Sequence, residues 1–451
     1  MSEYLKYNIF DKLALKAEIN NKIDTSLYDK YELKRGLRNN NGTGVLVGLT
    51  QVGSVHGYVL NEGKKTSIEG RLNYRGISLK KLVNGFQNEK RHGFEEISYL
   101  LLFGRLPSQE ELQEFKIILS NYRKLPEGFI EDMILKFPSK DIMNKLQRSV
   151  LVSYSFDENP DDISVKGLIE QSIKMLSRFP SFIAYGYQAK AHYYDKKSLY
   201  LHSPNTGLDT AENILHLIRP DNKFTEKEAE LLDLSLVLHA EHGGGNNSSF
   251  ATHVVSSTGT DTYSAIASAV GSLKGPKHGG ANIKVIQMIE NIKENVSNWR
   301  DKEALKDYLY RILKKEVFDR KGLIYGMGHA IYTISDPRAV LLKEKAYELA
   351  KEKNRTSEYE FYRNIEELTI EIFKEIKNGK DICANVDLYS GFVYDMLNIP
   401  KELYTPIFAT ARVAGWCAHR IEQIVSEPKI IRPAYQNIEP NQEYVDLKNR
   451  R

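Results

Sequence analysis

The sequence has only two cysteines among its 451 residues, Cys383 and Cys417, and their spacing matches no metal-binding or redox motif. We therefore expect two buried thiols in a reducing compartment rather than a disulfide framework. No apolar run reaches the roughly 18 residues that a membrane-spanning helix needs. The N-terminal stretch MSEYLKYNIFDKLALKAEI carries acids and lacks the features of a signal or transit peptide. These absences predict a cytoplasmic protein.

Charge of one sign is also scarce. The net charge is +4, with no block of like charges and no stripe of basic and aromatic residues, so nucleic acid is not an expected partner. No membrane partner is expected either. Hydrophobic residues make up 41% and charged residues 27%, which is typical of a globular protein. A chain of this length can bury a large core, and we expect at least two domains.

The pattern of apolar residues favours a mainly α fold. Residues 1–35 predict one or two charged helices, and glycines between residues 36 and 76 predict short strands and turns. From Ile77 onward the chain predicts helix after helix, without the alternation of strands and helices that a parallel sheet needs.

Several helix ends have recognisable signals. Ser108 with Glu111 and Thr225 with Glu228 are capping boxes, and the second predicts a helix that ends where His242 meets Gly243. A helix over residues 263–273 should end at Gly275, and Asp336 before a proline predicts another helix start.

Residues 239–282 concentrate histidine and glycine. They contain four of the eleven histidines, namely His239, His242, His253 and His278, and two glycine clusters. Glycine loses the most conformational freedom on folding, so its accumulation beside histidine indicates a backbone shaped to hold a ligand.

Three glycine-rich or turn-like segments each carry one ionisable group suited to acid–base catalysis. The groups are His278 in GPKHGG, His329 in GMGH and Asp387 in NVDLYSG. A neutral imidazole can donate a hydrogen bond to a carbonyl oxygen, and a carboxylate can remove a proton from carbon beside a polarised carbonyl. Any one histidine alone is more often structural, but three such segments in one half of the chain favour a site.

Three arginines suit a small di- or tricarboxylate substrate. Arg338, Arg412 and Arg432 can each hold a carboxylate through two parallel hydrogen bonds, although any one alone is more often a surface or ion-pair residue.

Other motif interpretations fail. HAEH at residues 239–242 is not a zinc hydrolase motif, and no third ligand stands at metal spacing. GSLKGPK lacks the end of a P-loop, GMG is too short for a dinucleotide fingerprint, and no nucleophile elbow occurs.

Taken together, the motifs resemble one family. GPKHGGAN, GMGHAIYTISDPRA and NVDLYSG are similar, in order and spacing, to the three active-site signatures of citrate synthases, and HAEHGGGN resembles the oxaloacetate-binding segment of that family. The blocks NYRG, FEEISYLL and RFP also match, so the resemblance covers roughly residues 50–435.

The resemblance implies a mainly α-helical, two-domain fold with a few short strands near the N-terminus. Residues 51–282 and 397–451 would form a large domain, residues 283–396 a small one, and residues 1–50 an N-terminal extension. The protein would be a homodimer that condenses acetyl-CoA with oxaloacetate and hydrolyses the product to citrate and CoA. No metal or redox cofactor is implied.

The resemblance also implies residue roles. Asp387 would remove a proton from the acetyl methyl group, His278 would hold the thioester oxygen, and His329 would polarise the oxaloacetate carbonyl. His242, Arg338 and Arg412 would bind the oxaloacetate carboxylates, with Arg432 supplied across the dimer interface. His239 and His253 are left with structural roles.

The sequence departs from the family where basic residues can contact CoA phosphates, because Ala330 and Thr333 stand there. Four lysines are the remaining candidates: Lys274, Lys277, Lys343 and Lys345.

Alternatives remain open. A 2-methylcitrate synthase would use propionyl-CoA with the same residues, and one methylene is worth only about 1–3 kcal/mol in an apolar pocket. Functions of other classes are a metal-dependent hydrolase built on the His239–His253 cluster, which bound zinc would support, and an inactive helical scaffold or regulator. The intact His278, His329 and Asp387 argue against the scaffold.

Overall fold

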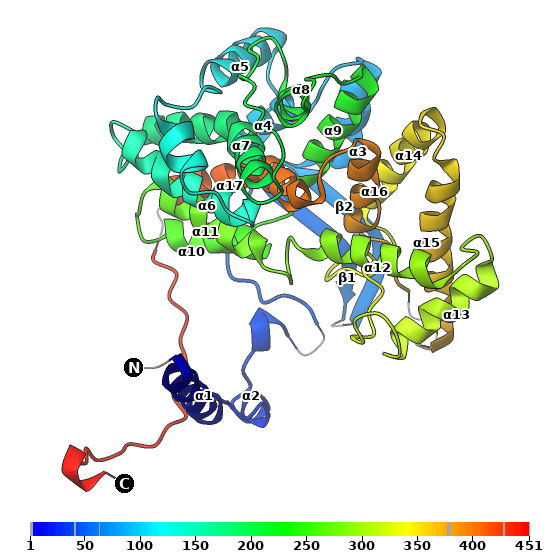
Figure 1. The fold of residues 1–451 in the computed structure, drawn as a ribbon. Helices are drawn as coiled ribbons and strands as arrows, with labels where there is room; N and C mark the ends of the chain where they lie inside the picture. The colour runs from blue at the N-terminus through cyan, green and yellow to red at the C-terminus, as the bar shows by residue number, and fades with distance from the viewer. Residues whose placement is uncertain are drawn as a thin grey trace. The chain divides into compact units, whose positions relative to one another are not determined.

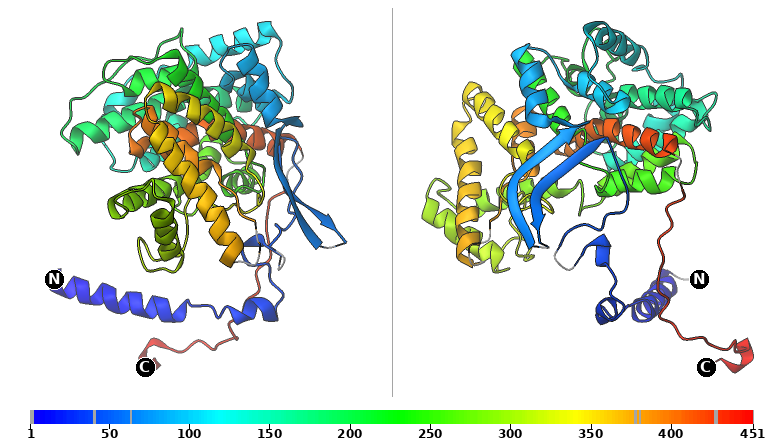
Figure 2. Two further views of the ribbon diagram at one scale, coloured as in Figure 1. Left: turned by 90° about the vertical axis from the view of Figure 1, so that its right-hand side faces the viewer. Right: turned by 180° about the vertical axis from the view of Figure 1, so that it is seen from behind.

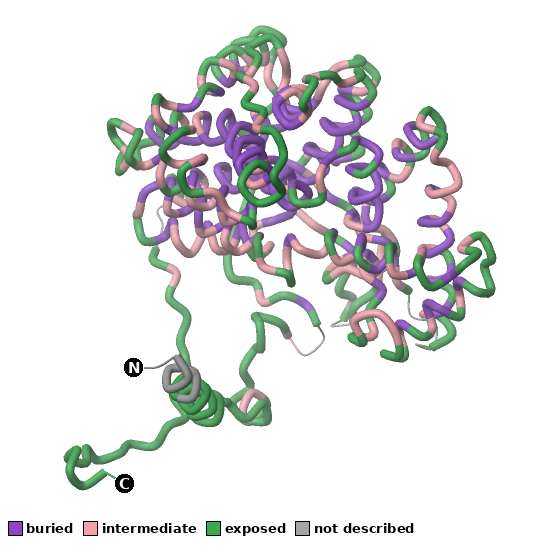
Figure 3. Tube along the Cα trace, viewed as in Figure 1, coloured by how far each residue is buried: buried purple, intermediate pink, exposed green. Residues whose placement is uncertain are grey.

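A computed structural model describes residues 3–39, 42–62, 64–376, 379, 381–426 and 429–450. The chain divides into two compact units, Met1–Leu49 and Thr50–Arg451. The first unit contains helix α1 (Glu3–Asn20), the short helix α2 (Ser26–Lys30) and the 3-10 turn η1 (Arg35–Leu37). The prediction of one or two helices there is confirmed. In the described part of α1 the chain is exposed (Figure 3), and apolar side chains such as Leu13 and Ile19 are exposed with it.

A three-stranded antiparallel sheet opens the second unit. Strands β1 (Gly53–Asn61) and β2 (Lys64–Tyr74) form a long hairpin, and the short β3 (Ile77–Ser78) pairs with β2 (Figure 2). The prediction of short strands holds only in part, because β1 and β2 are long. Among the described residues 36–52, the only pairing is an isolated bridge between Arg38 and Gly44.

The rest of the second unit is helical, which confirms the mainly α fold. The helices after the sheet are α3 (Leu79–Asn88), α4 (Phe94–Phe103), α5 (Gln109–Asn121), α6 (Ile142–Ser153), α7 (Val165–Tyr193), α8 (Thr210–Ile218), α9 (Glu226–His239), α10 (Asn247–Ser256) and α11 (Thr262–Lys274). They continue with α12 (Ala281–Asn295), α13 (Lys302–Leu313), α14 (Pro337–Glu352), α15 (Thr356–Ile376), α16 (Val386–Met396) and α17 (Tyr404–Val425). Short helical turns lie at Phe129–Leu135, Tyr154–Phe156, Lys401–Leu403 and Leu447–Asn449.

The predicted helix signals are largely confirmed. Ser108 and Thr225 form capping boxes at the starts of α5 and α9, and Asp336 caps α14. Helix α11 ends at Gly275 as expected. The predicted end of α9 is wrong by three residues. The helix stops at His239, so His242 lies on the loop that follows rather than on the helix.

Helices α7 and α17 form the centre of the core. Most of their residues are buried, and α17 packs against α4, α7, α9, α10 and α11 (Figures 1 and 3). Helices α12 to α16 pack largely against one another, with α14 and α16 in contact. The assignment of residues 283–396 to a small domain, and of 51–282 with 397–451 to a large one, stays a prediction. Among the described residues, no helix combines the length and the apolar character needed to cross a membrane.

Candidate active site

The loop after α9 carries His242 into the interior. Gly243 adopts a positive φ of 82°, a conformation that favours glycine, and turns the chain directly after the histidine. His242 is buried, and its Nε2 has no hydrogen-bond partner among the described residues. Burial, followed by the positive charges of Arg338 and other neighbours, holds the pKa of His242 well below its usual value. The imidazole is therefore neutral and has a polar atom available for a ligand.

Arg412 lies on α17 with its whole side chain buried. Its Nε donates to the His239 carbonyl oxygen at 2.6 Å, but Nη1 and Nη2 have no partner among the described residues. Burial lowers the pKa of Arg412 to about 10, and the ring of Phe408 lies 4.8 Å from the guanidinium carbon. A buried cation with unpaired donors is unfavourable unless a ligand completes its hydrogen bonds. An anion would do so.

Arg338 is held by Asp336, the residue that caps the start of the same helix, α14. Asp336 accepts hydrogen bonds from Arg338 Nε at 3.0 Å and from Nη2 at 2.7 Å, and both side chains are buried. Burial lowers the pKa of Arg338, but Asp336 outweighs burial and the net shift is upward. The sequence singled out Arg338 as a carboxylate ligand but not Asp336, whose bidentate contact orients the guanidinium.

His329 lies on the loop before α14, beside His242. The two ring centroids are 5.1 Å apart, and Tyr332 stacks on His329 at 4.6 Å. The Nδ1 of His329 accepts from the backbone N–H of Ile331 at 3.1 Å and of Tyr332 at 3.3 Å. In the neutral ring the proton is therefore on Nε2, which is the arrangement needed to donate to a carbonyl oxygen.

The β-hairpin supports this loop. A side-chain carbon at Gly57 would lie 2.5 Å from the Ile331 carbonyl oxygen, and one at Gly70 would lie 2.7 Å from the Tyr332 ring. The Gly70 N–H also donates to Ser335 Oγ at 3.1 Å. Glycine at these positions allows the loop backbone to lie directly on the sheet.

Asp387 stands in the first turn of α16, next to the His329 loop. Asn385 joins the two segments, because its backbone N–H donates to the Gly326 carbonyl at 2.9 Å and its Nδ2 to the Gly328 carbonyl at 2.8 Å. Burial raises the pKa of Asp387 to about 6, although Arg338 and Arg412 oppose that shift. A carboxylate with a pKa near neutrality is suited to general-base catalysis.

His278 occupies the turn between α11 and α12. Burial, and then Arg412, lowers the pKa of His278 to about 4, so the ring is neutral at neutral pH. Its Nε2 lies 3.1 Å from Ser248 Oγ, which also accepts a hydrogen bond from Trp416 Nε1 at 3.0 Å. Thr405 anchors the turn through the Gly279 carbonyl at 3.1 Å.

Most of the predicted site residues are brought together. Arg338 and Arg412 both lower the pKa of Asp387, and Arg338 also lowers that of Arg412. His242 and His329 are in ring contact, and Arg412 lowers the pKa of His278. Arg432 is not part of this group, since it is exposed on the segment after α17. Phe408, Tyr332 and Ser248 also surround the group, and nothing in the sequence pattern marked them.

Three of the four lysines considered for CoA phosphates form ion pairs. Lys343 pairs with Glu366 at 2.6 Å, Lys345 with Glu348 at 3.1 Å and Lys274 with Asp141 at 3.3 Å. Lys277 is exposed. Their role toward CoA stays a prediction.

Comparison with known proteins supplies the final observation. The family model for the C-terminal domain of citrate synthase matches residues 41–434. A citrate synthase from Synechocystis is 36% identical over 389 residues, which is 85% of this chain and 89% of the relative. A 2-methylcitrate synthase from Shewanella oneidensis is 30% identical, covering 84% of this chain and 92% of the relative. The solved citrate synthase from Thermoplasma acidophilum, a ternary complex with carboxymethyl coenzyme A and oxaloacetate, aligns with a TM-score of 0.74 at 26% identity, covering 92% of this chain and 99% of that one.

Proposed function

The chain belongs to the citrate synthase family, and we propose that the half-buried group built around His278, His329 and Asp387 carries out its reaction. The family match covers most of the chain and confirms the resemblance that the motifs indicated. The enzyme is an acyltransferase that condenses acetyl-CoA with oxaloacetate and hydrolyses the product to citrate and CoA.

Oxaloacetate binds first in this proposal, at the buried donors. The observation that carries the assignment is Arg412, whose Nη1 and Nη2 are buried without partners among the described residues and lie in the same site as the unpaired Nε2 of His242. A dicarboxylate supplies the acceptors that these atoms lack, and charge-assisted hydrogen bonds of this kind are the strong ones. Arg338 adds a second cationic group, oriented by Asp336. The solved Thermoplasma relative, a complex with oxaloacetate, supports this choice of ligand.

The condensation then uses two imidazoles and one carboxylate. Asp387 removes a proton from the acetyl methyl group while His278 donates a hydrogen bond to the thioester oxygen, which gives the enolate. The enolate carbon attacks the oxaloacetate carbonyl carbon, and His329 gives its Nε2 proton to the carbonyl oxygen, which becomes the hydroxyl of citryl-CoA. The proton held by Asp387 returns to His329 before the next turnover. Water then hydrolyses the thioester and releases CoA. Preorganised donors aimed at the developing enolate oxygen should provide the largest catalytic effect.

Ser248 positions the ring of His278. Its Oγ lies 3.1 Å from His278 Nε2, accepts a hydrogen bond from Trp416 Nε1 at 3.0 Å and donates to Asn246 Oδ1 at 2.9 Å, so three neighbours fix the hydroxyl group that the ring contacts. Ser248 is therefore a positioning residue in this scheme.

Side chains handle every proton and charge in this scheme, so we propose that no metal or redox cofactor takes part in the chemistry. We place the enzyme in the cytoplasm, as a homodimer in which Arg432 completes the partner's site. The exposure of Arg432 on the segment after α17 supports this assignment, because an arginine that acts in its own site would not lie in solvent. The start of that segment is anchored where the Ile431 N–H donates to Ser257 Oγ at 3.0 Å.

The function is tested by mixing the purified protein with oxaloacetate and either acetyl-CoA or propionyl-CoA and measuring thiol release. We expect a higher kcat/KM for acetyl-CoA. A higher kcat/KM for propionyl-CoA would make the protein a 2-methylcitrate synthase. This is the second candidate function, because a 2-methylcitrate synthase from Shewanella oneidensis is 30% identical to this chain. Thiol release from neither substrate would refute the enzymatic function.

The supply of Arg432 in trans has its own test. Hybrid dimers of R432A and D387N protomers should recover partial activity, because one of the two sites then contains an intact Asp387 and the intact arginine of its partner. Confirmed hybrids without any activity would contradict the trans arrangement.

A further inference from the structure

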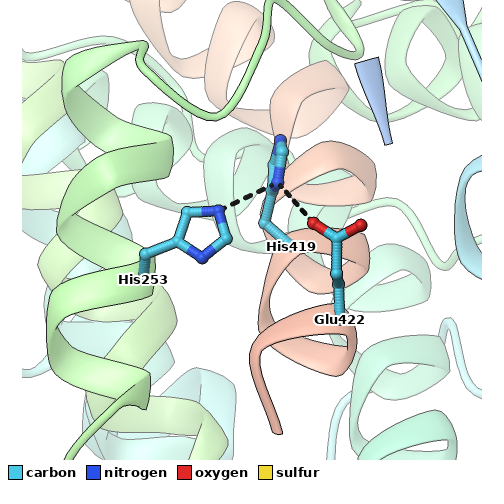
Figure 4. Close-up of side chains that lie close together, drawn as sticks. All are labelled: His253, His419 and Glu422. Atoms are coloured by element: carbon cyan, nitrogen blue, oxygen red, sulfur yellow. Dashed lines mark hydrogen bonds and ion pairs between the residues drawn. The ribbon is translucent and has the colours of Figure 1, made fainter. Parts of the chain in front are cut away.

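Helices α10 and α17 bring two histidines and a glutamate together outside the residues assigned to the reaction. His253 comes from α10, and His419 and Glu422 come from α17 (Figure 4). The Nδ1 of His419 lies 3.1 Å from the Nε2 of His253 and 3.9 Å from Glu422 Oε2. The three side chains, called here the His253–His419–Glu422 cluster, each offer one potential ligand atom, and these atoms lie within 4.8 Å of one another.

Each member of the cluster also makes a hydrogen bond to a residue outside the cluster. His419 Nε2 donates to Glu241 Oε1 at 3.0 Å, and His253 Nδ1 donates to Gln423 Oε1 at 2.8 Å. The backbone N–H of Gln51 donates to Glu422 Oε1 at 2.6 Å, whereas Oε2 has no hydrogen-bond partner among the described residues. Histidines that bind metals almost always donate their other N–H to a carboxylate or carbonyl oxygen, and carboxylate ligands are hydrogen-bonded in the same way.

These outer contacts fix which atoms face inward. With the imidazole protons directed to Glu241 and Gln423, the inner nitrogens of both rings present lone pairs to each other. In the metal-free protein a single proton between His253 and His419 accounts for their 3.1 Å contact. A cation that accepts both lone pairs would replace that proton.

The geometry suits a small divalent ion. Zinc–nitrogen bonds of about 2.0–2.1 Å in a tetrahedral site place the ligand atoms about 3.3 Å apart. The observed 3.1 and 3.9 Å bracket this separation, and all three ligand atoms lie within 4.8 Å of one another, so side-chain movements that bring Glu422 and His253 closer would complete the site. A side-chain carbon at Gly244 would lie 3.4 Å from His253 Nε2, so the glycine leaves this side of the pair without a side chain.

We propose that the His253–His419–Glu422 cluster binds a divalent transition-metal ion, with Zn²⁺ as the best match and water as the fourth ligand. Two imidazole nitrogens and one carboxylate oxygen form a ligand set that zinc, cobalt and nickel accept. The ion ties α10 to α17. The ion does not touch the proposed reaction site. It is linked to that site through His419, which donates a hydrogen bond to Glu241, the residue directly before His242.

A second histidine–carboxylate group, formed by His92, Asp209 and Glu212, is less suited to a metal. Lys116 Nζ already lies 2.9 Å from Asp209 Oδ2, the same oxygen that His92 contacts at 3.2 Å. The ammonium group therefore occupies the place of a cation. In addition, Glu212 accepts a hydrogen bond from the Asp209 N–H at 2.7 Å as part of the cap of α8.

The experiment uses the untagged full chain after treatment with EDTA. Zn²⁺ binding is measured by isothermal titration calorimetry, and Co²⁺ binding by the visible absorption of the tetrahedral ion. We expect one ion per chain, and H253A and E422Q should each weaken binding by at least about tenfold. The control H192A removes an exposed histidine on α7 and should bind as the wild type does. Zn²⁺ should also raise the Tm of the wild type and not that of H253A.

Three results would overturn the proposal. They are the absence of saturable binding of both ions, unchanged affinity in H253A and E422Q, and loss of binding in H92A alone. The nearly isosteric E422Q keeps the test decisive if H253A does not fold, as checked by circular dichroism. None of these measurements depends on turnover, so they stand apart from the proposed function.

Discussion

Replacing Arg412 by methionine should stabilise the ligand-free protein, whereas the same change at Arg420 should destabilise it. Both arginines lie on α17 and are almost completely buried. Arg420 uses all three nitrogens, because Nε donates to Thr262 Oγ1 at 2.9 Å, Nη1 to Ser256 Oγ at 3.1 Å and Nη2 to the Thr260 carbonyl at 2.6 Å. Among the described residues, Arg412 has only its Nε bond to His239.

The opposite signs follow from this difference. An unpaired buried donor costs about 1–3 kcal/mol, and a hydrogen bond to a charged group contributes about 1.5–3 kcal/mol. Loss of two unpaired donors and one bond in R412M should therefore raise the free energy of unfolding by about 1–2 kcal/mol. R420M removes three satisfied bonds and leaves their acceptors buried, so it should lower the free energy of unfolding by roughly 3–5 kcal/mol.

Thermal unfolding with and without oxaloacetate measures both effects. Oxaloacetate should raise the Tm of the wild type and have little effect on R412M, since the guanidinium that the ligand completes is gone. Circular dichroism checks that both variants fold. A loss of stability in R412M comparable to that in R420M would mean that Arg412 is structural. Undiminished stabilisation of R412M by oxaloacetate would remove it from the binding site.

Three further predictions concern the reaction itself. D387N should abolish thiol release while oxaloacetate still raises the Tm; normal turnover would exclude Asp387 as the base. In the wild type, kcat/KM for acetyl-CoA should fall as the pH is lowered through about 6, because the raised pKa of Asp387 means that the carboxylate required as base is protonated below that pH. A flat profile between pH 5 and 8 (roughly the range over which such a group titrates) would contradict this reasoning. S248A should lower kcat and leave the KM for oxaloacetate unchanged, since Ser248 acts only by positioning the ring of His278; a change confined to KM would argue against this positioning role.

The sequence predicted the local structure well wherever one short segment determines it. The capping boxes at Ser108 and Thr225 form as expected, because each needs only residues three positions apart. The prediction failed at the end of α9, where His239 is followed by a turn rather than by one more helical turn. Glu241 explains the difference: its carboxylate accepts from His419 Nε2 and from the Gly243 N–H, and these contacts hold the loop away from the helical path. Such a tertiary interaction is not visible in a local pattern.

The candidate site also contains some residues that a local sequence pattern identifies and others that only the fold brings in. His278, His329 and Asp387 lie in glycine-rich or turn-like segments that stand out in the chain, so the residue pattern alone is enough to name them. Ser248 and Phe408 carry no such signal, because a serine and a phenylalanine in a helix become notable only when the fold places them beside His278 and Arg412. The pattern left His253 with a structural role, because His419, which its ring contacts, lies 166 positions later in the chain.

Helix α17 carries both Arg412, which has two unpaired nitrogens among the described residues, and Arg420, whose three nitrogens are all hydrogen-bonded. A helix with an unpaired buried cation needs compensation elsewhere, because its uncompleted hydrogen bonds oppose folding. The same helix has that compensation at its C-terminal end, in the three bonds of Arg420 and the contact of His419 with Glu241. Between them, Gly415 allows the loop to approach, since a side-chain carbon there would lie 2.5 Å from the Ala240 carbonyl oxygen. One rigid element therefore fixes the loop that carries His242 and also presents a guanidinium whose hydrogen bonds only a bound anion completes.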